Sequence, residues 1–229
     1  MLMQVNPLYK KQNMSPKNLS VSNKTHKFLL NNLKDKKTFQ IYKKFEKNLK
    51  IKEDFIVAVS GGPDSLALSF LSKVYSIKKS IKVNYFIVDH KLRKNSSKEA
   101  KFVKKLLKKL DCNLKILNWI GKKPKTNIQS IAREKRYALL INQSRKLKIN
   151  NILLGHQKDD LYENFFIRIL RGSGLNGIAS FNISSKEQNI NLIRPLLNFS
   201  KKDLKHIAKR VFGTFIPDSS NDDEQFKRV

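Results

Sequence analysis

The loop at residues 60–65, Ser-Gly-Gly-Pro-Asp-Ser, has the composition of an anion-binding site. Its two consecutive glycines allow a sharp turn and a close approach of the backbone to a ligand. The serine hydroxyls, and the unpaired N–H groups at the start of a following helix, would face a phosphate. Asp64 would repel a bare phosphate, but a bridging Mg²⁺ takes oxygen ligands from carboxylate and phosphate together. The alternative is a capped helix start with no ligand, in which Asp64 or Ser65 is the N-cap.

Three acids lie within five residues further along the chain: Asp159, Asp160 and Glu163. Asp160 and Glu163 share one face of a predicted helix. Asp159 falls in its first turn, where the helix dipole favours a carboxylate, so capping is an alternative role for it. In a chain whose formal net charge is +30, these acids offer an anionic pocket for a cation, either Mg²⁺ or an ammonium group.

Two further sets of polar residues could meet a nucleotide. Asp89 ends a predicted strand, although an aspartate there could equally start a turn. The neighbouring His90 is more typical of a packed or solvated strand end than of a catalyst. Arg133 and Arg136 lie three residues apart on a predicted helix and so can point to the same side, which would suit a phosphate. The alternative for the two arginines is ordinary surface charge.

The elements that must position these residues alternate along the chain. Short apolar runs rich in β-branched residues predict buried strands at 55–60, 83–90, 114–119, 151–156 and 191–196. Apolar residues at helical spacing predict helices at 39–49, 65–77, 97–110, 128–147, 159–170 and 201–212. This alternation predicts an α/β fold, a doubly wound, mostly parallel sheet flanked by helices. Ligands bind beyond the carboxyl ends of the strands in such sheets, and the polar residues above follow predicted strands.

The charge indicates a polyanionic partner, most simply a nucleic acid. The chain of 229 residues has 48 Lys and Arg against 18 Asp and Glu. Residues 91–125 alone hold 13 basic and 2 acidic residues. Lysine is abundant throughout, however, so a solvated helix face is the simpler reading of most of these lysines. We expect two parts, a basic N-terminal extension with a short helix at 1–50 and a catalytic domain at 51–229.

The single cysteine, Cys112, excludes an intramolecular disulfide and any multi-cysteine metal or iron–sulfur site built by this chain. No run of eighteen apolar residues predicts a membrane span, and no apolar segment near the N-terminus predicts a secretory signal. We therefore expect a cytoplasmic protein without a membrane partner.

The motif Ser-Gly-Gly-Pro-Asp-Ser, preceded by a predicted strand and followed by a predicted helix, resembles the PP-loop of the N-type ATP pyrophosphatases. These enzymes have a Rossmann-like fold. Later segments resemble one family within them, the tRNA(Ile)-lysidine synthetases. These segments are VDHKLR (88–93), IAREKRY (131–137), GHQKDDLYENFFIRILRGSG (155–174), IRPLLNFSKKDL (193–204) and PDSSNDD (217–223). The resemblance runs in the same order from about residue 54 to the end of the chain.

The resemblance implies a ligase that uses ATP and Mg²⁺. ATP would adenylate O2 of the wobble cytidine of an isoleucine tRNA with a CAU anticodon, and free L-lysine would then attack C2 and expel AMP. The implied catalytic residues are Asp64, Asp89, Arg133 and Asp160. The implied ATP-binding residues are Ser60, Gly61, Gly62, Pro63, Asp64 and Ser65. The implied substrate-binding residues are Asp159, Asp160, Glu163, Arg171 and Arg194, and the implied metal ligands are Asp64 and Asp160.

The sequence departs from the family pattern at two positions, because Gln157 replaces a usual histidine and Asn164 a usual threonine. Gln157 cannot titrate near neutral pH, whereas Asn164 keeps hydrogen-bonding ability. The chain stops at Val229, where family members continue into tRNA-binding regions, so a minimal form and a fragment both stay open. A homodimer also stays open.

Other functions also stay open. One is another PP-loop enzyme that modifies tRNA or forms amides by adenylation, although tRNA-thiolating members typically need more cysteines. A second is a metal-dependent phosphoesterase that would use Asp89, His90, His156, Asp159 and Asp160. A third is a non-catalytic RNA-binding protein in which Tyr85 and Trp119 stack on bases. The phosphoesterase leaves the loop at 60–65 unexplained.

Overall fold

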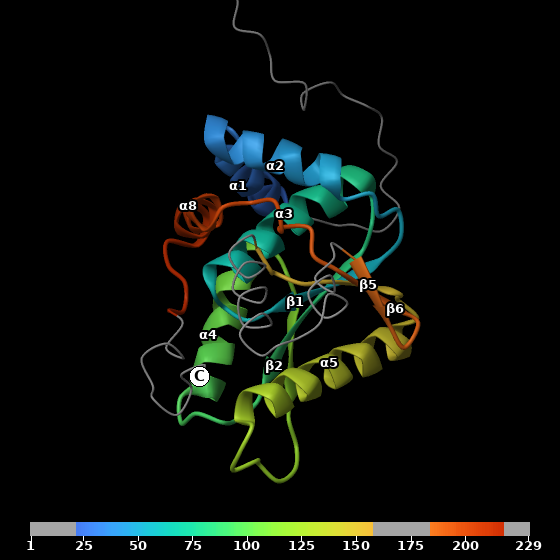
Figure 1. Ribbon diagram of the computed structural model, residues 1–229. Helices are drawn as coiled ribbons and strands as arrows, with labels where there is room; N and C mark the ends of the chain where they lie inside the picture. The colour runs from blue at the N-terminus through green and yellow to red at the C-terminus, as the bar shows by residue number, and fades with distance from the viewer. Residues whose placement is uncertain (1–21, 158–183, 218–229) are drawn as a thin grey trace, which may run out of the picture.

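The computed structural model describes residues 22–157 and 184–217, which build one sheet covered by helices (Figure 1). Its strand order is β3-β2-β1-β4-β6-β5. The strands are β1 (Phe55–Val59), β2 (Val83–Asp89), β3 (Leu114–Asn118), β4 (Asn151–Leu153), β5 (Ser184–Glu187) and β6 (Ile190–Ile193). Every pairing is parallel except that of β5 with β6, which is antiparallel. The predicted α/β class with a mostly parallel sheet is therefore confirmed.

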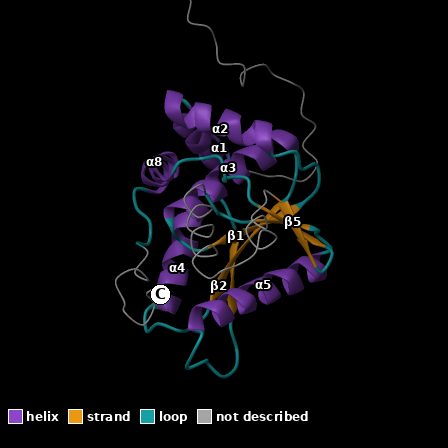
Figure 2. Cartoon of the chain, in the orientation of Figure 1, coloured by secondary structure: helices purple, strands orange, loops and turns teal. Residues whose placement is uncertain are grey.

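Helices cover both faces of the sheet (Figure 2). They are α1 (Asn23–Leu33), α2 (Lys36–Asn48), α3 (Pro63–Lys79), α4 (Ser96–Leu107), α5 (Ile128–Leu147) and α8 (Lys201–Phe212), with a 3-10 turn at Lys108–Leu110. Strand β1 shows why two layers form: Phe55 and Val57 point into the core shared with α1–α4 and α8, whereas Ile56 points into the core shared with α5. Among the described helices, none is long and apolar enough to cross a membrane.

The sheet differs from the sequence-based prediction at its edge. Strand β5 was not predicted, because its sequence Ser-Ser-Lys-Glu is polar and its residues are mostly exposed. Its turn has Gln188 and Asn189 at φ 48° and 67°, the left-handed conformation of a tight two-residue hairpin. Strand β4 ends at Leu153 rather than at residue 156, so residues 154–157 form a loop at the carboxyl edge. The predicted helix at 159–170 lies outside the described residues.

The helices before residue 50 pack into the main core. Tyr42 and Phe45 of α2 are fully buried in the same cluster as Phe55 of β1. The Tyr75 hydroxyl of α3 donates to the carbonyl oxygens of Leu49 and Ile51 at 2.9 and 2.8 Å, which fixes the connection between α2 and β1. The division into an extension and a catalytic domain at residue 50 stays a prediction, and no break in packing accompanies it.

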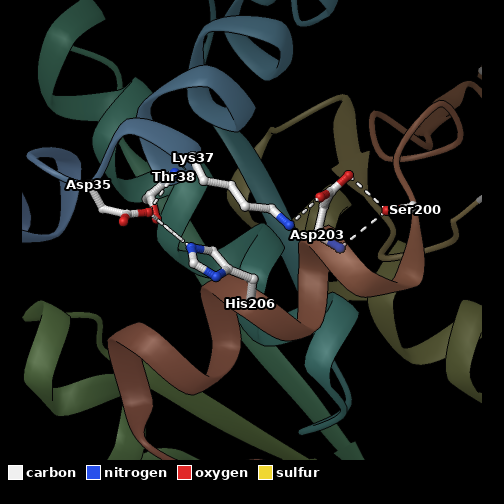
Figure 3. Close-up of polar contacts among 6 residues, drawn as sticks. All are labelled: Asp35, Lys37, Thr38, Ser200, Asp203 and His206. Carbon is white, nitrogen blue, oxygen red and sulfur yellow. Dashed lines mark hydrogen bonds and ion pairs between the residues drawn. The ribbon is translucent and has the colours of Figure 1, made fainter.

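Polar contacts fasten α2 to α8 (Figure 3). The Asp35 carboxylate caps α2 by accepting hydrogen bonds from the N–H and hydroxyl of Thr38 at 2.9 and 2.8 Å. The same carboxylate lies 2.9 Å from Nε2 of His206 on α8. One turn earlier on α8, Asp203 forms an ion pair with Lys37 of α2 at 3.0 Å. Because α8 packs against α3, these contacts join the N-terminal helices to the layer that carries the loop at 60–65.

We expect Asp35→Ala to lower the free energy of unfolding at neutral pH by about 1–2 kcal/mol, the usual cost of losing an N-cap. Hydrogen bonds from the Thr38 N–H, His206 and the Thr38 hydroxyl hold the pKa of Asp35 well below its ordinary 3.8. The carboxylate therefore stabilises the fold fully above that ordinary value, and its contribution declines as the pH falls below it. Urea unfolding of parent and variant should show a difference that shrinks in acid.

The control is Asp35→Asn, which keeps the capping oxygen and removes only the charge. It should therefore lose less stability at neutral pH than Asp35→Ala. A difference between the parent protein and Asp35→Ala that stays constant from neutral pH down into acid would contradict the role given to the ionised carboxylate.

Candidate active site

One side chain, that of Ser65, closes the loop between β1 and α3. Its Oγ accepts hydrogen bonds from the backbone N–H groups of Ser60 and Gly61 at 3.1 and 3.0 Å, and donates to the carbonyl oxygen of Gly62 at 3.0 Å. The Ser60 hydroxyl lies 3.1 Å from the same oxygen. Ser65 is buried. The hydroxyl that was predicted to contact ATP is thus used to shape the loop.

Helix α3 begins without a side-chain cap. Gly62 is its N-cap and provides no side-chain hydrogen bond, and Pro63 follows at the first helical position. The alternative in which Asp64 or Ser65 is the N-cap is therefore wrong. The N–H groups of a first helical turn have no acceptor within the helix and attract an anion. Asp64 lies in this turn and is half-buried.

Two glycines bring distant segments against the loop. Gly61 has φ +93°, and a Cβ added there would lie 2.6 Å from Cγ2 of Val103 and 2.8 Å from Cδ1 of Ile216. The backbone N–H of Ile216 also donates to the Gly61 carbonyl at 3.0 Å. A Cβ at Gly155, in the loop after β4, would lie 3.1 Å from the backbone N and Cα of Ser65. The loop is therefore enclosed by α4, by the segment after α8 and by the loop after β4.

Asp89 lies at the carboxyl end of β2 and is buried. Its Oδ1 accepts a hydrogen bond from the N–H of Lys91 at 2.9 Å, and its Oδ2 accepts one from the hydroxyl of Ser97 at 2.5 Å. Burial raises the pKa of Asp89, but the hydrogen bonds from Ser97 and Lys91 outweigh it, so the pKa lies below its ordinary value. Both oxygens of this predicted catalytic residue hold the turn between β2 and α4.

The turn presents His90 to a group of aromatic and basic side chains. The His90 ring meets Trp119, which follows β3, edge to face at a centroid distance of 6.0 Å. Lys123 lies over the Trp119 ring at 4.0 Å. On the other side, Nε of Arg136 donates to Nε2 of His90 at 3.4 Å. Burial, helped by Arg136 and Lys123, lowers the pKa of His90 to about 4, so the ring is neutral and can accept this hydrogen bond.

Three arginines surround His156 in the loop after β4. Burial, together with the positive charges of Arg133, Arg194 and Arg136, lowers the pKa of His156 to about 3. Arg194 follows β6, is buried, donates to the Ser185 hydroxyl at 3.0 Å and interacts with Tyr137. Arg133 lies over the ring of Tyr137 at 5.3 Å. Two predicted residues, Arg133 of α5 and Arg194 after β6, thus lie near His156 at the carboxyl edge and make its surroundings cationic.

We expect neither His90 nor His156 to take up a proton between pH 5 and 8. Proton uptake would place a buried cation beside Arg136 in one case and beside the three arginines in the other. A pH titration followed by NMR of the histidine ring carbons measures both values, and His90→Asn and His156→Asn assign the signals. A midpoint between pH 6 and 7 for either ring would contradict the described burial.

Several predicted residues fall in the part of the chain between the described ranges. Asp159, Asp160, Glu163 and Arg171 lie there, as does Asn164. Of the predicted metal ligands only Asp64 is described, and residues 22–157 and 184–217 contain no group of three or more potential ligands around one point. Gln157, which replaces the usual histidine, is buried beside this edge.

Sequence reasoning missed three contributions to the site. The close contact of Gly155 with Ser65 depends on the packing of β4 against β1, and only an isolated glycine after an apolar run hinted at it. Tyr137 was present in the Arg-Tyr motif but received no role. Ile216 lies in a segment with no predicted element, and no sequence signal links it to Gly61.

A family model described as "PP-loop domain" matches residues 32–229. The tRNA(Ile)-lysidine synthase of Orientia tsutsugamushi is 40% identical over 185 residues, which are 81% of this chain and 41% of that protein. The enzyme of the same name from Bradyrhizobium diazoefficiens is 37% identical over 182 residues, 79% of this chain and 50% of that protein. The chain thus spans about half the length, or less, of these relatives.

Among solved structures, the U34-tRNA thiolase NcsA from Methanococcus maripaludis, determined with its [4Fe-4S] cluster, superposes with a TM-score of 0.69. The two sequences are 17% identical, and the match covers 79% of this chain and 65% of that one. This likeness supports the α/β architecture.

Proposed function

The chain belongs to the PP-loop domain family, and from that membership we propose that it is the catalytic part of a tRNA(Ile)-lysidine synthetase. It would transfer AMP from ATP to O2 of the wobble cytidine in an isoleucine tRNA with a CAU anticodon, releasing pyrophosphate. The amino group of free lysine would then form a bond to C2 and expel AMP, while a proton leaves the amine. A cytoplasmic location belongs to the same proposal.

The strongest support is the convergence of motifs at one edge of the sheet. The loop at 60–65 follows β1, Asp89 ends β2, His156 follows β4 and Arg194 follows β6. The carboxyl edge is the ligand-binding edge of an open parallel sheet. The relatives named tRNA(Ile)-lysidine synthase add support, since they share 37–40% identity over about four-fifths of the chain.

In this proposal the loop and the arginines near His156 bind different parts of the ATP. N–H groups of the first turn of α3 bind the phosphates, and Ser65 keeps the loop in shape. We assign to the guanidinium groups of Arg133 and Arg194, which both act on His156, the stabilisation of negative charge that develops at the α-phosphate. Asp89 acts as a positioning residue, because both of its oxygens hold the turn that carries His90.

Asp64 fits a Mg²⁺ site, since its half-buried carboxylate lies beside the proposed phosphate site. Mg²⁺ typically binds through one or two carboxylates together with phosphate oxygens and water, so Asp64 and Asp160 would suffice. When bound, Mg²⁺ neutralises phosphate charge. We assign Asp159 and Glu163 to the ammonium group of lysine, on the sequence pattern alone.

The decisive experiment mixes the protein, ATP, Mg²⁺, labelled lysine and an isoleucine tRNA transcript with a CAU anticodon. Label should enter the tRNA only when ATP is present, with one AMP released for each lysine incorporated. A methionine tRNA transcript, which has the same anticodon, is the control and should stay unlabelled. The proposal would be overturned if the isoleucine tRNA stayed unlabelled while the protein thiolated tRNA or hydrolysed a phosphodiester.

A further inference from the structure

The outward face of α4 and of the 3-10 turn after it is covered by positive charge. Six lysines are exposed there: Lys98, Lys101, Lys104, Lys105, Lys108 and Lys109. Lys109 reaches back to the carbonyl oxygen of Phe212 at 3.1 Å. We call this set of six lysines the α4 lysine face. At 1.5 Å per residue, the helix extends for about 18 Å.

Little negative charge balances the α4 lysine face. Within residues 22–157 and 184–217, none of its lysines forms an ion pair with an acid. Glu99, the acid in the first turn of α4, is paired with Arg93 at 3.0 Å. Closely spaced ammonium groups repel one another, and a polyanion bound along the helix relieves that repulsion.

An aromatic ring lies at the edge of these charges. Phe102 is 42% exposed, which is unusual for so large an apolar side chain. Lys98 and Lys105 stand four residues before it and three after it, so both are its neighbours on the helix surface. The opposite face, with Val103 and Leu107, is fully buried, which fixes the direction in which Phe102 points. Lysines around an exposed aromatic ring form a surface on which an unpaired base can stack while its flanking phosphates are bound.

The helix that carries the α4 lysine face adjoins the candidate active site with its first turn and its buried side. Helix α4 begins at the turn that Asp89 holds through Ser97. Val103, adjacent to Phe102, lies against Gly61 of the loop. Figure 1 shows α4 running from the end of that turn along the flank of the sheet. Val103 points inward, so the body of α4 separates the α4 lysine face from the loop, and a nucleic acid bound along α4 would pass about one helix diameter, ~10 Å, from the loop at 60–65.

We propose that α4 is an RNA-binding helix, in which the α4 lysine face contacts the phosphates of one RNA strand and Phe102 stacks on an unpaired base. The inference rests on the proposed function in that the RNA is the tRNA substrate. It adds the surface through which this part of the chain holds the tRNA.

The role of the α4 lysine face in binding phosphates is tested with the double variant Lys101→Gln/Lys105→Gln. The matched control combines Lys50→Gln with Lys82→Gln, which removes two exposed lysines that precede β1 and β2 at the opposite edge of the sheet. The affinity for the isoleucine tRNA transcript is measured over a range of salt concentrations. Loss of two phosphate contacts should reduce the slope of log affinity against log salt by about 1.5. If the Lys101/Lys105 variant and the Lys50/Lys82 control showed equal salt slopes, the proposal would be overturned. The α4 lysine face would then bind another partner, such as an acidic protein.

The stacking is tested with Phe102→Leu, which keeps an apolar side chain and removes the aromatic ring. Stacking on one base corresponds to a loss of affinity between about fivefold and about a hundredfold. The salt slope should not change, because no charge is removed. Phe102→Tyr should retain the affinity, and thermal unfolding shows whether each variant is folded. Full affinity in a folded Phe102→Leu would overturn the role of Phe102.

Lysine incorporation is measured in parallel, so that the two proposals fail separately. If lysine enters the tRNA and only the α4 predictions fail, the RNA-binding helix is wrong and the function stands. If the α4 variants weaken RNA binding as expected and no lysine enters the tRNA, the helix stands and the function is wrong. If the protein is active, the double variant Lys101→Gln/Lys105→Gln should have a higher KM for tRNA and an unchanged KM for the substrate lysine.

Discussion

Asp64→Asn should reduce the release of AMP from ATP by at least about a hundredfold, the usual cost of losing one group that stabilises charge in a transition state. Asparagine has nearly the same shape, so the first turn of α3 should persist. The amide carries no charge and is a poor ligand for Mg²⁺, which prefers carboxylate oxygens. Because Asp64 is half-buried in the loop and is not part of the α4 lysine face, the affinity for tRNA should change by less than about twofold.

Two measurements on the same preparation check this result: AMP release by chromatography and tRNA affinity by fluorescence anisotropy. The control is Asp111→Asn, because Asp111 is exposed and its φ of 55° is one that asparagine adopts readily. It should keep full activity. If Asp64→Asn weakened tRNA binding as strongly as AMP release, Asp64 would have a structural role in place of a catalytic one.

Gly61→Ala should be the most destabilising single substitution in the loop, with a loss of about 2–4 kcal/mol of unfolding free energy. Two costs add. A residue with a Cβ is strained at φ +93°, and its Cβ would overlap Val103 on one side and Ile216 on the other. Both neighbours are anchored, Val103 in the core and Ile216 through its hydrogen bond to Gly61. Relief therefore requires the loop to move, and activity should fall with stability.

Gly213→Ala separates the two costs. Gly213 also has a positive φ, +79°, but a Cβ there would meet nothing within 4 Å. It should lose only the backbone term, about 1–2 kcal/mol, and keep its activity. Urea unfolding and AMP release measure both effects. Similar losses of stability for Gly61→Ala and Gly213→Ala would show that the contacts of Gly61 with α4 and with residue 216 are unimportant.

The elements that bury apolar residues could be predicted from sequence. Helix α5 has the predicted bounds, 128–147, and β1 and β2 differ by one residue at their carboxyl ends. Their local pattern and their tertiary environment agree, because both faces of the sheet are covered. Strand β5 could not be predicted in this way, since its stability comes from pairing with β6 and from a turn at Gln188 and Asn189.

The candidate site could be predicted in its location and less well in its details. The order of strands and helices places residues 60–65, 89 and 194 at one edge, which parallel topology requires. The use of Ser65 within the loop and the hydrogen bonds that occupy both Asp89 oxygens depend on exact backbone geometry. The meeting of Arg194 with Tyr137 and His156 depends on contacts between residues far apart in sequence. No local pattern contains that information.

The hydrogen bond from Ile216 to Gly61 has a consequence for how the protein is made on the ribosome. The chain is synthesised from its N-terminus, so the sequence of the loop emerges long before residue 216 does. A nascent chain that has emerged only through α5 also lacks Gly155, against which the loop packs. In such a nascent chain, the loop at 60–65 lacks its contacts with both Gly155 and Ile216. We therefore expect nascent chains to acquire ATP affinity late, once the segment after α8 has left the exit tunnel.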